Sequence, residues 1–153
     1  MSIRLIVGSF AAAIMALLLS VSLATAQDGY GKQKVVYHVN YSGGDGDKLY
    51  RGALRNIQNH INAVGVENIE VKLVMHGNGL GLLASALTNE LLQGQVVELK
   101  SQNVEMHVCN NTLRGRNISY DEDLFDVFEE DIVPSGVAEI AHLQQLGYTY
   151  IKP

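Results

Sequence analysis

The chain has 153 residues, 47% of them hydrophobic, which gives room for one folded domain with one core and none for a second. Acidic residues outnumber basic ones, with 16 Asp and Glu against 11 Lys and Arg and a net charge of −5. Such a chain lacks both the Lys/Arg-dense stretch of a nucleic-acid binder and the basic amphipathic helix of a membrane-surface protein, so we expect neither partner.

The first 26 residues have the pattern of a signal peptide. Arg4 supplies the positive start, residues 5–27 carry no charge, and Ala24-Thr25-Ala26 gives the small-x-small pattern of a cleavage site. We therefore expect cleavage after Ala26, a periplasmic or secreted location, and no stable membrane insertion afterwards. The alternative is an uncleaved anchor, because an uncharged run of this length can span about 30 Å of hydrocarbon. Glycine and serine residues dilute the run and no basic cluster follows it, which favours cleavage.

The first half of the remaining chain predicts a strand, a helix and a second strand. Residues 27–33 are polar and glycine-rich, and we interpret them as a flexible lead-in to a domain over residues 34–153. The apolar, β-branched run at residues 34–40 predicts the first strand. Apolar residues then recur every three or four positions up to Val64, which predicts a helix capped by Asp47. Residues 69–75 predict the second strand.

The second half continues this alternation. Further helices are expected at residues 82–87, 89–102 and 134–145, and further strands at residues 104–108, 131–133 and 148–151. Between them, Arg114-Gly115-Arg116 resembles a turn, and residues 120–125 are acidic with some helical spacing.

Strands that alternate with helices predict a mainly parallel sheet covered on both faces, because right-handed crossovers place helices on either side. The carboxyl ends of such strands lie along one edge, where ligands and catalytic groups collect. We expect this edge to gather Asn40, Tyr41, His76 and Cys109.

Cys109 is the only cysteine, although exported proteins normally use cysteines in disulfide pairs. It is therefore either an inert core residue or a residue kept for reactivity or intermolecular pairing, and composition leaves both open. If Asn110, Asn111 and Thr112 open a helix, their N–H groups point toward the sulfur and favour the thiolate, with a pKa below the usual value of about 8.5.

Positively charged neighbours would favour the thiolate further. Arg114, Arg116 and His76 are the candidates, and His76 is singled out because it follows a strand and precedes the glycine-rich turn that begins at Gly77. The other histidines, at positions 38, 60, 107 and 142, are interpreted as structural or surface residues. A metal site would need a third donor beside His76 and Cys109, and no CxxC, HxxxH or HxH spacing supplies one, so we predict no metal and no cofactor.

Several segments resemble the DsrE/DsrF-like family, specifically its exported branch. They are the cysteine turn at residues 108–113, the His76-Gly77 turn, and the ending from Val133 to Pro153 with its Pro-Ser-Gly-Val-Ala-Glu-Ile and Gly-Tyr-x-Tyr-Ile-Lys-Pro segments. The resemblance covers residues 34–153. It implies a three-layer α/β/α fold with a mainly parallel sheet of about five strands, and assembly as a homotrimer or homohexamer.

The resemblance also implies a role in sulfur relay, in which a cysteine at the tip of the third strand carries sulfur as a persulfide. Cys109 occupies that position, so we expect a sulfurtransferase-like carrier whose partners are a sulfur donor and acceptor, with Cys109 and His76 as catalytic residues. The expected ligand-binding residues are Asn40, Tyr41, Gly77, Asn110, Asn111, Thr112 and Arg114. The alternatives are a non-catalytic module that binds a metal or small anion at the same edge, and an oligomeric structural protein whose cysteine is incidental.

Overall fold

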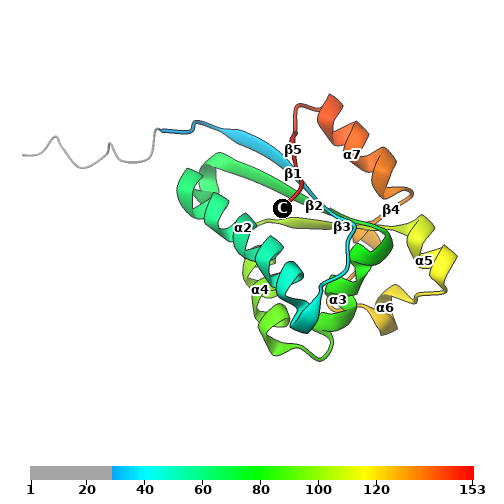
Figure 1. Ribbon diagram of the computed structural model, residues 1–153. Coiled ribbons are helices and arrows are strands. Elements are labelled where there is room, and N and C mark those ends of the chain that lie inside the picture. Colours follow the sequence, from blue (N-terminus) through cyan, green and yellow to red (C-terminus); the bar gives the residue numbers. More distant parts are fainter. Residues whose placement is uncertain (1–28) are drawn as a thin grey trace, which may run out of the picture.

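The computed structural model describes residues 29–153, and the signal peptide predicted for residues 1–26 lies outside this range. The described chain alternates strands with helices, as the sequence predicts (Figure 1). The strands are β1 (Gln33–Val39), β2 (Ile69–Met75), β3 (Glu105–Cys109), β4 (Ile132–Val133) and β5 (Thr149–Ile151). The helices are α2 (Lys48–Val64), α3 (Gly81–Ala86), α4 (Glu90–Ser101), α5 (Asn110–Arg116), α6 (Tyr120–Asp123) and α7 (Gly136–Gln145). In this part of the chain, none of the helices has the length and apolar character needed to cross a membrane.

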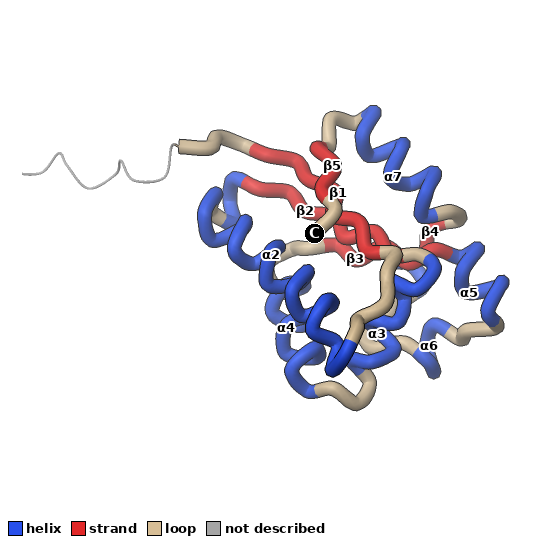
Figure 2. The backbone as a smooth tube through the Cα atoms, in the orientation of Figure 1, coloured by secondary structure: helices blue, strands red, loops and turns tan. Residues whose placement is uncertain are grey.

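The strands form one parallel sheet in the order β4-β3-β2-β1-β5, and Figure 2 shows it as the central layer between helices. From β1 to β4 the chain adds each strand beside the previous one. Helix α7 then carries the chain back across the sheet, so that β5 pairs with β1 and Tyr150 lies opposite Val36. The predicted three-layer α/β/α fold with a parallel sheet is confirmed.

The main core lies between the sheet and helices α2, α3 and α4. The apolar stripe predicted for the first helix is confirmed, because five α2 side chains are each at most 3% exposed: Tyr50, Leu54, Ile57, Ile61 and Val64. All of them except Val64 pack against alternate residues of the strands, such as Val35 and Tyr37 of β1 and Leu73 of β2. Burying a large aliphatic or aromatic side chain contributes about 1.5–3 kcal/mol, so this face supplies most of the apolar stabilisation.

The opposite face of the sheet is covered by α7 and is far more polar. Its apolar cluster consists of Val36, Val74, Ile140, Leu143 and Tyr148. Beside this cluster, Lys72 forms ion pairs with Glu105 and with Glu70, the latter at 3.7 Å, and His107 lies 3.1 Å from Glu139 of α7. Lys72, whose side chain is 11% exposed, is thus paired with two exposed carboxylates, which lets its charge lie beside the apolar cluster.

Two local predictions are wrong. The residues from Arg114 to Arg116 form the last turn of α5 and not a separate turn, because the left-handed residue that ends the helix is Asn117, with φ of 53°. Asp47 stands at the N-cap of α2 but its side chain makes no cap hydrogen bond. Its carboxylate instead accepts hydrogen bonds from Ser85 and Asn89, so tertiary contacts have replaced the local cap.

Gly79 shows why the turn after β2 is rich in glycine. A Cβ at this position would overlap the carbonyl group of Val39 at the end of β1. We expect Gly79→Ala to lower the free energy of unfolding by more than about 2 kcal/mol. Gly94→Ala is the matched control: nothing lies within 4 Å of a Cβ there, so removing a helical glycine should add up to about 1 kcal/mol. Urea denaturation of both variants checks this, and an unchanged Gly79→Ala protein would contradict it.

Candidate functional site

Cys109 and His76 meet at the carboxyl edge of the sheet. The β2–β3 register pairs Met75 with Val108, so the residues that follow them, His76 and Cys109, stand side by side. Gly136, the first residue of α7, lies against both. A Cβ on Gly136 would be 3.1 Å from the Cβ of His76 and 3.3 Å from that of Cys109. Cys109, His76 and Gly136, together with the first turn of α5, are called the Cys109 site below.

Hydrogen-bond donors converge on the sulfur of Cys109. The residue is only 5% exposed, and this burial by itself raises the pKa of the thiol. The N–H of Gly136, the hydroxyl and N–H of Thr112 and the N–H of Asn111 act in the opposite direction and prevail, so the pKa of Cys109 lies below its ordinary value. The sulfur is therefore enclosed by groups that stabilise an anion and not by aliphatic side chains alone.

Thr112 connects the sulfur to the turn after β2. Its hydroxyl oxygen accepts a hydrogen bond from the Gly77 N–H at 2.9 Å. Because that bond occupies a lone pair, the hydroxyl proton is free to point toward the sulfur of Cys109, where it favours the thiolate. Thr112 and Gly77 were both predicted as site residues, and the structure brings both to the Cys109 site.

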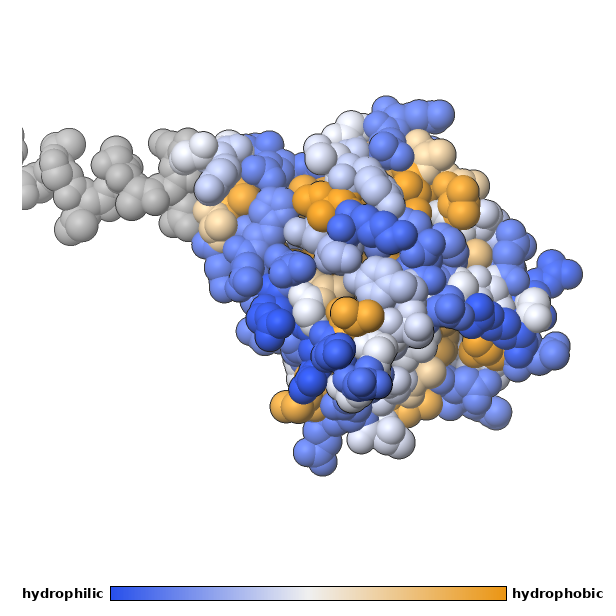
Figure 3. Space-filling model, in the orientation of Figure 1, coloured by the Kyte–Doolittle hydropathy of each residue, from blue (hydrophilic) through white to orange (hydrophobic). Residues whose placement is uncertain are grey.

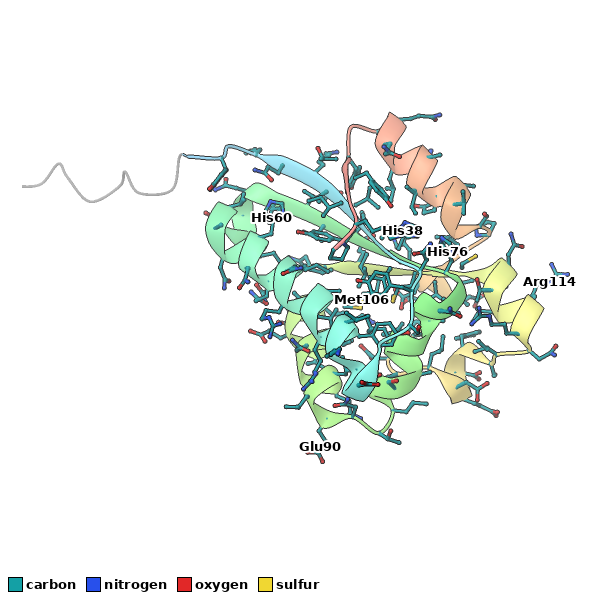
Figure 4. All side chains as sticks on the ribbon, viewed as in Figure 1. His38, His60, His76, Glu90, Met106 and Arg114 are labelled. Carbon is teal, nitrogen blue, oxygen red and sulfur yellow. The ribbon has the colours of Figure 1, made fainter. Side chains whose placement is uncertain are left out.

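Hydrogen bonds link three side chains in series, from Tyr150 through His38 to His76. Nε2 of His76 lies 2.8 Å from Nε2 of His38, and Nδ1 of His38 lies 2.8 Å from the hydroxyl of Tyr150 on β5. The centroids of the two imidazole rings are 4.7 Å apart, and the ring planes differ by 28°. Figure 4 shows them side by side where the sheet meets the start of α7.

His38 and His76 are both uncharged near neutral pH. Burial lowers the pKa of His38 to about 4, with smaller contributions from His76 and Lys152. Burial, followed by the charge of Lys152, also lowers the pKa of His76. The positive charge expected from His76 is therefore absent at neutral pH, and its imidazole is in the state that can accept a proton.

The remaining predicted site residues do not all lie at the Cys109 site. Asn40 lies near the site, with its carbonyl oxygen 3.8 Å from the position of a Cβ on Gly77, and Asn110 opens α5. Tyr41 uses its hydroxyl to donate to the carbonyl of Pro153 at 3.2 Å. Arg114 is exposed and, in Figure 4, lies at α5 well away from the two labelled histidines beneath α7, His38 and His76.

Residues of α5 line two cavities. Arg114 and Asn110 line one of about 490 Å³. Arg116 donates to Oδ1 of Asn78 at 3.0 Å and lines another, of about 330 Å³, whose wall includes Tyr50. Neither of these two cavities is lined by Cys109. The arginines of α5 therefore line these cavities and are not among the groups that lower the pKa of the thiol.

Sequence reasoning missed three residues of this region: His38, Tyr150 and Gly136. His38 and Tyr150 are 112 positions apart and meet only because β5 pairs with β1. Gly136 was predicted only as part of a helix start, and its contact with the sulfur depends on where α7 crosses the sheet. Within residues 29–153, no three His, Cys, Asp or Glu side chains are grouped so that they could hold a metal ion.

The fold and this edge define an open three-layer α/β/α protein with a cysteine at the tip of a central strand. The model of the DsrE/DsrF-like family matches residues 34–153, and the chain belongs to that family. No curated protein sequence matches it significantly.

Solved structures agree with this assignment. The protein of unknown function MTH1491 from Methanobacterium thermoautotrophicum is 28% identical, with a TM-score of 0.65, over 80% of this chain and 100% of its own. The ychN protein from E. coli is 19% identical and shares the fold, with a TM-score of 0.61 over 79% of this chain and 99% of its own.

The hydroxyl of Thr112 gives a direct test of the site's electrostatics. Thr112→Val removes a donor to the sulfur, so the pKa of Cys109 should rise and alkylation by iodoacetamide at neutral pH should slow. Thr112→Ser keeps the hydroxyl and should stay close to the wild type. The measurement is the pH profile of the alkylation rate, and equal midpoints for the valine and serine variants would show that the hydroxyl does not stabilise the thiolate.

The lowered pKa of His38 makes stability depend on pH. Between about pH 6.5 and 4 the unfolded chain binds a proton that folded His38 does not, so stability is lost as the pH falls through this window and is fully present above it. We expect a loss on the order of 1–3 kcal/mol. Chemical denaturation above pH 6.5 and near pH 4 measures it. His38→Gln should show a smaller loss, and a loss as large as that of the wild type would refute the assignment.

Proposed function

We propose that this protein is a carrier of sulfane sulfur and that Cys109 holds the sulfur as a persulfide. The observation that carries the proposal is the set of donors around Cys109, which favours an anionic sulfur at the carboxyl edge of the sheet. The family resemblance supports it, because it implies sulfur relay by a cysteine at the tip of the third strand. Cys109 is the last residue of β3.

The chemistry needs no redox partner. The Cys109 thiolate attacks the outer sulfur of a donor such as thiosulfate or a polysulfide, a new S–S bond forms, and the bond inside the donor breaks. The electron pair leaves with the donor fragment, as sulfite from thiosulfate or as a shortened polysulfide. An acceptor thiolate then attacks the outer sulfur of the persulfide, and Cys109 returns as a thiolate.

The site suits this exchange in two ways. The donors from Gly136, Thr112 and Asn111 that hold the thiolate are also placed to hold a persulfide anion. Because Cys109 is 5% exposed, small donors reach it more readily than bulky ones. A glycine at position 136 supports such access, since any side chain there would press on His76 and Cys109.

The setting of this carrier is also part of the proposal. We propose that the protein is exported after cleavage behind Ala26 and works as a homotrimer or homohexamer, with a small molecule or protein as the sulfur acceptor. In the face shown in Figure 3, apolar residues form separate patches among hydrophilic ones.

Intact-mass analysis tests the carrier directly. The purified protein, with and without prior reduction, is incubated with thiosulfate, with polysulfide or with cysteine-derived sulfur. We expect the wild type to gain the mass of one sulfur atom, and the gain to disappear after treatment with a reductant.

Cys109→Ser is the matched control and should gain no sulfur. A wild type that stays unmodified with every donor, or a serine variant that gains the same mass, would contradict the assignment of the persulfide to Cys109.

A further inference from the structure

Three cations line a cavity at helices α2 and α4, which pack against each other. The cavity has a volume of about 400 Å³ and is called the α2–α4 cavity below. Its walls are formed by Lys48, Arg51 and Arg55 of α2 and by Leu91 and Gln95 of α4. Because these residues follow one another at spacings of three or four, each helix presents one face to the cavity.

The cations of this cavity have no counterion among the described residues. Within residues 29–153, no carboxylate oxygen lies within 4.0 Å of the charged nitrogens of Lys48, Arg51 or Arg55. Glu90, the first residue of α4, does not line the cavity, and Figure 4 shows it at the outer end of that helix. A chain whose acidic residues outnumber its basic ones thus gathers three cations without neutralising them.

The direction of the two helices adds to the positive potential. Nε2 of Gln95 donates to the carbonyl oxygen of Arg51 at 3.4 Å, and further along both helices Nε2 of Gln102 donates to Oε1 of Gln58 at 2.8 Å. The helices therefore run parallel. Lys48 is the first residue of α2, and the cavity also reaches the first turn of α4. The positive ends of both helix dipoles lie there, where they disfavour a cation and favour an anion.

Two buried polar atoms of the cavity's side chains have no hydrogen-bond partner in the described part of the chain. They are the donor Nε of Arg51 and the acceptor Oε1 of Gln95. Turning the amide of Gln95 round would not satisfy it, because its oxygen would then face the carbonyl oxygen of Arg51. Unpaired buried polar atoms are rare because they are costly. Both side chains are only partly buried, so a change of rotamer can turn these atoms toward a ligand.

We propose that the α2–α4 cavity binds a phosphate group, either as the free anion or as part of a lipid headgroup. Its oxygens accept hydrogen bonds from the guanidinium groups of Arg51 and Arg55 and from the ammonium group of Lys48. Hydrogen phosphate also keeps an O–H that can donate to Oε1 of Gln95, which sulfate lacks. This inference goes beyond the sulfur carrier, since Cys109 is not among the residues that line this cavity.

Isothermal titration calorimetry with inorganic phosphate tests the site. The ionic strength is held near 0.15 M with chloride, where charges more than about 8 Å away are largely screened. We expect saturable binding of one phosphate per chain and weaker binding of sulfate. Arg51→Gln should lower the affinity for phosphate about tenfold or more, because it removes charged hydrogen bonds to the anion.

A pair of lysine variants provides the matched control. Lys48→Gln should also weaken the binding of phosphate, and because Lys48 is exposed this change does not disturb the core. Lys32→Gln removes the same charge from an exposed lysine that precedes β1 and does not line the cavity, so it should bind phosphate like the wild type. Equal affinities of Arg51→Gln, Lys48→Gln and Lys32→Gln would overturn the site.

Sedimentation with vesicles distinguishes the two sources of the phosphate group. A protein that binds no free phosphate but sediments with phosphatidylglycerol vesicles, and not with phosphatidylcholine vesicles, uses the cavity for a lipid headgroup, provided that Arg51→Gln abolishes the sedimentation. Failure to bind either free phosphate or phosphatidylglycerol would show that the cavity holds only water. Equal affinity for sulfate and phosphate would contradict the part assigned to Gln95.

Sulfur loading of the same proteins keeps this inference apart from the carrier. Cys109→Ser should bind phosphate like the wild type, and Arg51→Gln should gain sulfur like the wild type. A wild type that gains no sulfur would leave the phosphate site standing, and a failed phosphate titration would leave the carrier standing.

Discussion

The stabilisation of one anionic sulfur by hydrogen-bond donors is the interaction on which the account of this protein depends. Burial alone makes a cysteine less acidic, and Cys109 is a buried residue. Donors from two helices reverse that effect: Thr112 and Asn111 from the start of α5, and Gly136 from the start of α7. Neither helix would be enough to identify a site, but their convergence on one atom distinguishes Cys109 from an inert core cysteine.

This convergence follows from the unequal faces of the sheet. Helices α2, α3 and α4 bury one face in an extensive apolar core, while α7 covers a face that carries ion pairs and histidines. Because α7 crosses from β4 to β5 over this polar face, its first residue lies on Cys109 and His76. The same crossing places β5 beside β1 and thereby brings Tyr150 to His38. One connection thus builds both the cluster of donors and the chain of histidines.

The sequence predicted what depends on local pattern. The stripe of α2, the parallel strands and the positions of Cys109 and His76 at strand ends follow from spacing and from the rule that such ends share an edge. Contacts set by long-range topology could not be predicted: nothing near His38 indicates that β5 will pair with β1. The length of α5 was also not predicted: the helix continues through Arg116, and Figure 4 shows Arg114 on it, away from His38 and His76.

The ultraviolet absorbance of the thiolate, followed across pH as the difference between the wild type and Cys109→Ser, tests the central interaction most directly. It reports the ionisation of this one sulfur without a reaction partner. Stabilisation of the thiolate should place the midpoint below the ordinary pKa of a free cysteine thiol. A midpoint at or above that value would show that burial prevails over the donors, and Cys109 would then be a core residue.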